Sequence, residues 1–502
     1  MSKNKILNTA LNFLIVFLVT SIIITLGSGE LFARPGGGHS YSGGGGGGFS
    51  GGGGGGDGGL LLLLFYILPP EISIPLVIGV IIFRYVSEQR KKKNSGTISS
   101  APPISSRIKS ADNTKMKVAD LKKHDPNFSE VLFIDFVASL FNKYHSYFGK
   151  NEFKNLSPFV SKSELNNSAS IKSRQDVKEI VIGSINIIDV RMSGNYIDVI
   201  TEIRANYTLF KNNKGSRLGV TERWKLTRKK GILSLEPDAM RRLTCPSCGG
   251  STDITDAGTC QYCGNKVEAG EQQWFLSQRR LTNSHLFSSA GLAHYEQEHG
   301  TSLPTVYQPG LNSELSTFAA RAGVDMNSWK SEFQNDVVSA YFMKIYTAWS
   351  NNDLNKVRNL LTDRVYENFM FWIDAYIREG LSNKLEQVRI SDIRLSKVTT
   401  DKYYDTVTVR IFASALDYVE NSSGKVIGGS SRRARKFSEY WTFIRKAGVR
   451  KDNFDFSKCP SCGAPADKIG KSGVCEYCNS KISNGDFSWV LAIITQDEEY
   501  VG

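Results

Sequence analysis

All eight cysteines of this 502-residue chain fall into two short clusters, and each cluster consists of two Cys-x-x-Cys pairs. The clusters are Cys245, Cys248, Cys260 and Cys263, and then Cys459, Cys462, Cys475 and Cys478. A Cys-x-x-Cys turn brings two thiolates to one side, and two facing turns complete a tetrahedral four-sulfur site. The ligand type and the spacing, with 11 and 12 residues between the pairs, predict one zinc ion per cluster.

The residues inside these turns fit a metal knuckle. Proline follows the first cysteine of each cluster, and the later turns end in Gly264 and Asn479, which tolerate a left-handed backbone. Four thiolates leave no position for water, so we expect two structural ions. The alternatives are a disulfide framework, which needs an oxidising compartment, a redox dithiol, which needs one pair, and an iron–sulfur cluster, which usually has other spacings.

Two apolar stretches near the N-terminus predict attachment to a membrane. Ile6–Gly29 contains no charged residue, and Leu60–Val86 is interrupted by Pro69-Pro70-Glu71 and is followed by Arg84 and the basic cluster Arg90–Lys93. About 20 apolar residues cross a bilayer core of ~30 Å, and cations gather on the cytoplasmic side. The first stretch is either a signal peptide or a signal anchor. Both readings place the C-terminal domains in the cytoplasm at the cell (inner) membrane, where thiols stay reduced.

The remainder of the chain shows one pattern twice. Each copy opens with apolar residues at helical spacing: Phe133, Val137, Leu140, Tyr144 and Phe148 in the first, and Val338, Tyr341, Ile345 and Trp349 in the second. Alternating strands follow at 197–203 and 407–413, then strands at 221–225 and 438–442 that share Glu-x-Trp, and then the cysteines. We predict a duplicated unit of helices, a curved sheet and a knuckle. Trp274 and Trp489, which follow the clusters, should pack each knuckle against its neighbour.

The second copy also resembles a known family. Phe333–Trp349, Asn352-Asp353-Leu354 and Leu360-Leu361-Thr362, with the strand Lys436–Phe443, are similar to the helices, turn and last strand of the TIM-forty-four-like domain, first known from the mitochondrial import-motor anchor. The resemblance implies a cone-shaped α+β fold, related to nuclear-transport-factor-like domains, whose concave face can hold an apolar ligand or acyl chain. This chain differs in its two apolar stretches, its duplication and its knuckles, so import-motor function is not carried over.

We therefore expect an α+β protein with two cone-shaped nuclear-transport-factor-like domains, each followed by a small zinc ribbon, behind an N-terminal membrane anchor. The expected segments are a signal peptide or anchor (1–33), a Gly/Ser-rich flexible segment (34–59), a transmembrane segment (60–88), a basic and polar linker (89–126), the first cone domain (127–243), zinc ribbon 1 (244–268), a helical connector (269–330), the TIM-forty-four-like cone domain (331–452) and zinc ribbon 2 (453–502).

Three functions compete, and we rank a non-enzymatic membrane-anchored scaffold first. Such a protein would bind a protein partner, the membrane face, or a lipid in the cone. A nucleic-acid binder is the alternative, suggested by the run Arg432–Lys436, although such runs are more often solvated. An enzyme ranks last, because it would need a buried acid/base pair in a pocket. None of the six histidines stands in a recognisable motif: His39, His124, His145, His285, His294 and His299.

Overall fold

The computed structural model describes residues 104–148, 150–169, 176–211, 214–252, 255, 259–267, 269–270, 272–286, 292, 300–449, 455, 457–497 and 499–502. Both apolar stretches, the glycine-rich segment and the first part of the linker (89–103) lie outside these residues, so the predictions made for them stay predictions. The rest of the linker is described, and residues 104–124 of it form a helix that the sequence analysis does not predict. In the described part of the chain, no helix combines the length and the apolar character needed to cross a membrane.

The first copy consists of helices packed on one antiparallel sheet. Its elements are α4 (Ile104–His124), α5 (Glu130–Tyr147), the 3-10 turn η1 (Asn151–Leu156), α6 (Lys162–Ala169), β1 (Asp176–Ser193), β2 (Tyr196–Lys211), β3 (Lys214–Lys229), α7 (Pro237–Arg241) and β4 (Phe275–Leu286). The strands pair in the order β1-β2-β3-β4. The Ser129 hydroxyl caps α5 by accepting from the N–H of Leu132, which is why the helix begins there.

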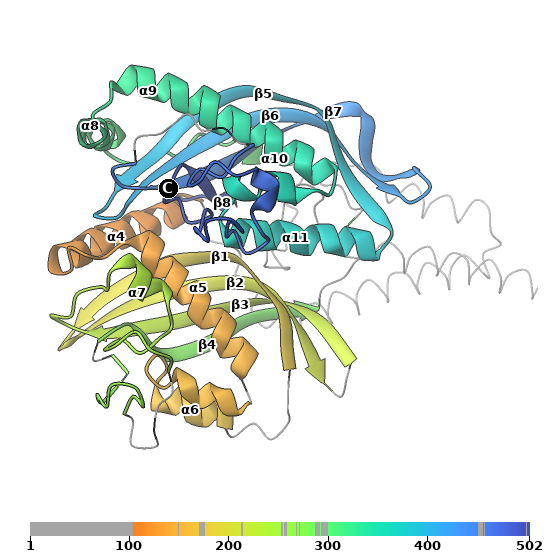
Figure 1. Ribbon diagram of the computed structural model, residues 1–502. Coiled ribbons are helices and arrows are strands. Elements are labelled where there is room, and N and C mark those ends of the chain that lie inside the picture. The colour runs from red at the N-terminus through yellow and green to blue at the C-terminus, as the bar shows by residue number, and fades with distance from the viewer. Residues whose placement is uncertain are drawn as a thin grey trace, which may run out of the picture. The chain divides into compact units, whose positions relative to one another are not determined.

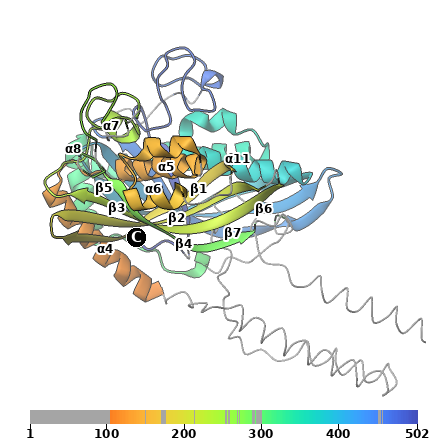
Figure 2. The same cartoon turned by 90° about the horizontal axis from the view of Figure 1, so that it is seen from below.

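The second copy repeats this order. Its elements are η3 (Gly300–Ser302), α8 (Leu311–Ala322), α9 (Met326–Glu332), the π-helical turn η4 (Phe333–Ser339), α10 (Ala340–Ser350), η5 (Leu354–Leu360), α11 (Asp363–Arg378), β5 (Leu381–Thr400), β6 (Tyr404–Asn421), β7 (Val426–Lys446), η6 (Ala466–Lys468) and β8 (Val490–Gln496). The sheet order is β5-β6-β7-β8, and all pairs are antiparallel. Figures 1 and 2 show the two long, twisted sheets with their helices. The predicted α+β class and the duplication are confirmed.

The predicted helical stripes form the cores. Phe133 and Leu140 of α5 have no exposed surface, and neither does Ile345 of α10. The alternating strand of the first copy buries Ile197, Val199, Thr201 and Ile203, while the intervening side chains are partly exposed. One face of this strand is therefore buried in the core and the other is partly exposed, as the alternation of apolar and polar residues predicts.

The fourth strand of each sheet corrects the expected domain boundaries. We expected a helical connector from residue 269, but residues 275–286 form β4, which pairs with β3 over Leu218–Thr227. Likewise, β8 pairs with β7 over Glu439–Ile444. Each cysteine cluster is thus an insertion between the third and fourth strands of a sheet. The sequence pattern alone predicts a position beyond the end of the domain, so that prediction is wrong.

The two copies contact each other through charged and apolar side chains. Arg204 of β2 lies 2.5 Å from Glu499, which follows β8, and Lys402 lies 3.1 Å from Glu236. Val490 of β8, which is fully buried, clusters with the core of the first copy. Its neighbour Leu491 belongs to the core of the second copy. Alternate residues of β8 therefore serve the two cores.

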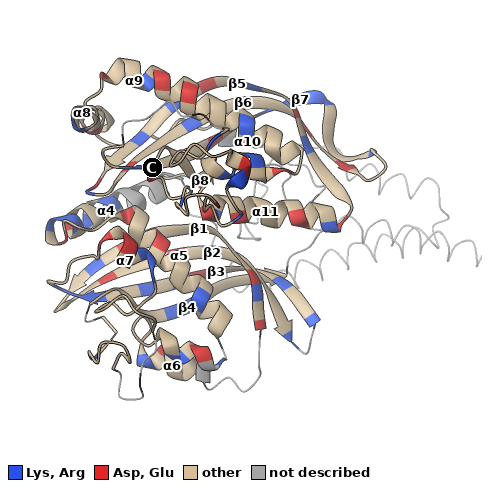
Figure 3. Ribbon diagram, in the orientation of Figure 1, with Lys and Arg blue, Asp and Glu red and all other residues tan. Residues whose placement is uncertain are grey.

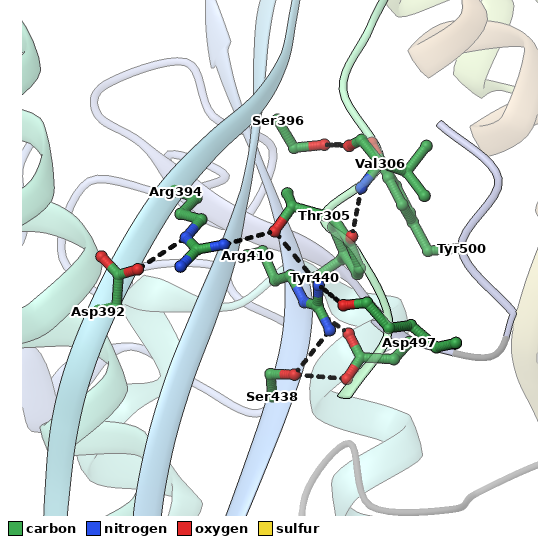
Figure 4. A network of polar contacts seen from close by, with 11 residues as sticks. Thr305, Val306, Asp392, Arg394, Ser396, Arg410, Ser438, Tyr440, Asp497 and Tyr500 are labelled. Carbon is green, nitrogen blue, oxygen red and sulfur yellow. Dashed lines mark hydrogen bonds and ion pairs between the residues drawn. The ribbon is translucent and has the colours of Figure 1, made fainter. Parts of the chain in front are cut away.

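The chain beyond β8 returns to the outer face of the second sheet, as Figure 4 shows. There Arg410 of β6, which is fully buried, lies 2.9 Å from Asp497. The Tyr500 ring stacks on Tyr440 with 3.7 Å between ring centroids. The Tyr440 hydroxyl accepts a hydrogen bond from the N–H of Val306. These contacts hold the segment after β8 against the sheet.

Candidate metal centres

The structure brings each set of four cysteines together. In both clusters all four sulfur atoms lie within 4.8 Å of one another. Regular tetrahedral geometry with Zn–S bonds near 2.3 Å requires sulfur atoms about 3.8 Å apart. Cys248 Sγ lies 3.9 Å from Cys260 Sγ, and Cys462 Sγ lies 3.8 Å from Cys475 Sγ. Each cluster could therefore hold one metal ion with little rearrangement.

The backbone around the sulfurs follows one pattern in all four turns. The N–H of Gly249 donates to the carbonyl of Cys245, and the N–H of Asn479 donates to that of Cys475. Gly249, Gly264, Gly463 and Asn479 have positive φ, which confirms the expected left-handed ends of the turns.

Some of these cysteines are held in an environment that favours the thiolate. Backbone N–H groups, that of Cys263 foremost, lower the pKa of Cys260 to about 7. The hydroxyl and N–H of Ser480 lower the pKa of Cys478 to about 6. A thiolate is the form that binds a metal ion, so the hydrogen bonds to these two sulfurs suit a ligand. The pKa values of Cys248, Cys459 and Cys462 are instead raised, that of Cys459 chiefly by burial, so the favourable environment is confined to part of each cluster. The described cysteines form no disulfide.

Exposure follows the same order in the two clusters. The first cysteine of each pair is buried, and the second is exposed in the first pair and half-buried in the later pair. Small apolar clusters surround the sulfurs, with Val267 in the first and Ile469 and Ile482 in the second. Solvent therefore has comparable access to both sites.

The tryptophans after the clusters have a different role from the one expected. Trp274 and Trp489 lie in the sheet cores, where Trp274 packs against Phe133 with 5.3 Å between ring centroids. An arginine from the end of the third strand stacks on each tryptophan ring. The Arg228 guanidinium lies 4.3 Å from the centroid of the Trp274 ring, and the Arg445 guanidinium lies 4.3 Å from that of Trp489. Each Arg–Trp pair joins the start of the insertion to its end.

The Glu-x-Trp motif places a buried carboxylate in each core. Glu222 accepts from the Trp224 indole at 2.7 Å, and Glu439 accepts from the Trp441 indole at 2.8 Å. Sequence reasoning missed this role, although the motif itself was visible in both copies. The signal that could have found it is a glutamate two residues before a tryptophan at the same place in both copies.

The surroundings of the two carboxylates differ. Glu222 lies beside Arg279 of β4 and 3.3 Å from His145 Nε2. Burial opposes its ionisation, but the His145 and Arg279 charges and hydrogen bonds lower the pKa of Glu222 well below its usual range. Glu439 instead accepts from the Tyr346 hydroxyl at 3.1 Å. The first copy thus uses an ionic cluster where the second uses a neutral donor.

Two small hollows lie in the described part of the chain away from these carboxylates. One of about 270 Å³ lies between α4 and β1 and is lined by Met116, Lys117, Asp120, Val190 and Met192. The other, of about 230 Å³, lies beside the first knuckle and is lined by residues that include Phe159, Arg242 and Cys245. The buried His145–Glu222 pair is therefore packed among rings and does not line either hollow.

The basic run at Arg432–Lys436 is only partly available to a ligand. Arg435 is buried and lies 3.4 Å from Asp417, while Arg432, Arg433 and Lys436 are exposed. Figure 3 shows acidic and basic residues mixed over most of the described helices and strands. This mixture differs from the continuous basic surface that nucleic-acid binding favours.

Comparisons with known proteins bear on the second copy. No curated protein matches the chain. A solved structure titled "Ntf2 like protein involved in plasmid conjugation" is 10% identical, and the alignment covers 63% of this chain and 90% of that chain with a TM-score of 0.17, too low to support an argument. Residues 316–458, which include α10, α11 and the first three strands of the second sheet, match the family model of the Tim44-like domain.

Proposed function

We propose that this protein is a non-enzymatic, membrane-anchored scaffold whose two cone-shaped, nuclear-transport-factor-like domains bind a protein partner in the cytoplasm. The Tim44-like match supports a binding role for the second copy. The observation that carries the proposal is that aromatic side chains of the chain itself cover the helix-facing side of both sheets. Trp224 packs on Phe141 with 5.3 Å between centroids, and Trp441 packs on Phe342 at 5.1 Å. Recognition then falls to the outer surface.

A lipid in the concave face is the second candidate ligand, and it would have to displace these rings. A buried acid/base pair would support an enzyme, and His145 and Glu222 form such a pair. That pair is better explained as a structural ion cluster, because both of its members are nearly inaccessible. Nucleic acid is a weaker candidate ligand than a protein partner or a lipid, because basic and acidic residues are mixed along the described chain.

We further propose that each four-cysteine cluster holds one structural zinc ion. The sulfur spacing fits a tetrahedral ion, and four thiolates suit zinc. A reducing cytoplasm keeps such thiols free, which agrees with the proposed topology at the cell membrane. Zinc would close each insertion between the third and fourth strands, and so support the edge of each sheet.

The scaffold role is tested by crosslinking the full-length protein in intact membranes, followed by purification and mass spectrometry. Recovery of one stoichiometric protein partner is expected. Recovery of nucleic acid alone, released by high salt, would contradict the scaffold and support the alternative. A chain with Arg432→Ser and Arg433→Ser serves as a control, since it should keep the protein partner and lose only nonspecific anion binding.

The zinc assignment is tested by elemental analysis of the same preparation. About two zinc ions per chain are expected, one for each set of four thiolates. A metal-free, disulfide-bonded protein would overturn both the sites and the proposed compartment.

A further inference from the structure

The second sheet presents a group of exposed cations at the turn between β6 and β7. We name residues 421–436, which contain this turn, the arm. Figures 1 and 2 show the turn extending past the end of α11. Four side chains of the arm are exposed and positively charged: Lys425, Arg432, Arg433 and Lys436. None of these four side chains forms an ion pair or a hydrogen bond within the described part of the chain.

The carboxylates next to the arm are paired with other cations and so do not neutralise it. Asp417 of β6 lies 3.4 Å from the buried Arg435. Glu420, at the end of the same strand, lies 3.8 Å from Lys384 of β5. The surface of the arm therefore keeps an excess of positive charge.

The backbone holds two of these cations in a shaped bulge. The pairing of β6 with β7 is interrupted at residues 431–434, which bulge out of the strand. The Ser430 hydroxyl accepts hydrogen bonds from the N–H groups of Arg432, at 3.3 Å, and Arg433, at 3.0 Å. A β-bulge changes the direction in which side chains leave a strand. The bulge therefore sets how Arg432 and Arg433 project from β7.

The described residues of the first copy contain no such bulge at the equivalent turn. There β2 and β3 pair in unbroken register up to Lys211 opposite Lys214. Arg217 of β3 lies 3.5 Å from Glu179, so this cation has a counter-charge. The bulge and its two arginines are thus an addition to the framework that the two copies share.

The composition of the arm distinguishes among negatively charged partners. The arm contains no aromatic residue, whereas protein interfaces and sites for single-stranded nucleic acid typically use aromatic anchors. Val426 and Ile427, which follow Lys425, are 37% and 42% exposed. Exposed aliphatic side chains beside cations suit a lipid surface, which offers negative headgroups and, below them, acyl chains.

We propose that the arm contacts an anionic lipid surface. Lys425, Arg432 and Arg433 lie at the negative headgroups, and Val426 and Ile427 lie at the boundary with the acyl chains. The contact depends on negative charge and not on one headgroup, because exposed cations attract any anionic surface. This inference rests on the membrane attachment proposed above, which would keep the arm near a bilayer and let weak contacts act.

The contact is tested by hydrogen exchange of the full-length protein in nanodiscs of phosphatidylcholine, alone or mixed with phosphatidylglycerol. Exchange within the arm should be about fivefold slower or more in the mixed discs, which is the effect of at least one cation at an anionic surface. Added salt should cancel the difference, because it screens the charges. Equal exchange in the two kinds of disc would overturn the proposal.

Variants of the arm separate its own charge from that of the whole protein. Arg432→Ser with Arg433→Ser should remove most of the slowing, whereas Arg432→Lys with Arg433→Lys keeps the charge and should retain it. The matched control is Lys211→Ser with Lys214→Ser, which removes the same charge from exposed residues at the turn of the first copy. It should leave exchange of the arm unchanged. An equal loss of slowing in this control would overturn the assignment to the arm.

A photoreactive benzoylphenylalanine in place of Ile427 identifies what the arm touches in intact membranes. A lipid adduct, detected by mass spectrometry, is the expected product. Adducts only with protein, or only with nucleic acid, would contradict the lipid assignment. A full-length protein that fails to enter nanodiscs would refute the membrane attachment itself, whereas an inserted protein with an unresponsive arm would refute this inference alone.

Discussion

The two copies share the same contacts between the third strand and the tryptophans, but different residues surround the equivalent carboxylates. Both place a carboxylate of the third strand on an indole two residues later, and both stack an arginine on the tryptophan that follows the insertion. Around Glu222 the first copy has Arg279 and His145, and around Glu439 the second has Tyr346. The comparison suggests that the framework contacts maintain the fold and that their surroundings are free to specialise.

The fourth strands of the two sheets also differ, in the number of cores that they enter. β4 serves its own core through Leu276, whereas β8 also contributes Val490 and Ala492 to the core of the first copy. Because β8 follows the second insertion directly, that insertion leads into a strand whose residues enter both cores.

The largest expected effect distinguishes the two fourth strands. Trp274→Ala and Trp489→Ala should each cost about 3–5 kcal/mol of unfolding free energy, as a buried tryptophan does. Trp274→Ala should weaken hydrogen-exchange protection mainly in the first copy, and Trp489→Ala in both, because β8 joins the two cores. Protection lost only in the second copy after Trp489→Ala would refute the shared role of β8.

A smaller effect compares the two buried carboxylates. Glu222→Gln should cost about 1.5–3 kcal/mol, because it weakens hydrogen bonds to charged groups, and Glu439→Gln about 1 kcal/mol for its hydrogen bonds to the Tyr346 hydroxyl and the Trp441 indole, which are neutral. Chemical denaturation of the two variants measures both. Equal losses would mean that the ionic surroundings of Glu222 add nothing to stability.

Lowering the pH should destabilise the first copy through its buried carboxylate, Glu222. The folded-state pKa of Glu222 lies below its ordinary value of 4.5, so its ionisation stabilises the first copy above that pH. This contribution is lost as the pH falls below about 4.5 towards the folded-state pKa. Hydrogen exchange between pH 5 and pH 3 should show the contribution fading, and Glu222→Gln should reduce the pH dependence of the first copy. Unchanged pH dependence in the variant would contradict this assignment.

Much of the framework could be predicted from the pattern of residues. The spacing of Val137 and Leu140, and the alternation from Ile197 to Ile203, indicated a buried helix face and a half-buried strand, and both are present. The cysteine spacing predicted the two four-sulfur groups. The segment Phe275–Leu286 was missed as a strand because most of it is exposed at the sheet edge and shows no alternation. Its conformation comes from pairing with β3.

The sequence by itself determined the local chemistry of this protein: which residues enter the cores, which turns can present thiolates, and that one unit occurs twice. The first two properties follow from spacings of two to about twelve residues, where chain geometry limits the outcome, and the duplication follows from the recurrence of the same pattern in each half of the chain. Only the tertiary structure decided that each knuckle interrupts a sheet and that Arg358 contacts the second knuckle. Arg358 meets Lys471 across 113 positions, and no local pattern marks such a pair. Long-range contacts of this kind arise only once the strands and helices have packed.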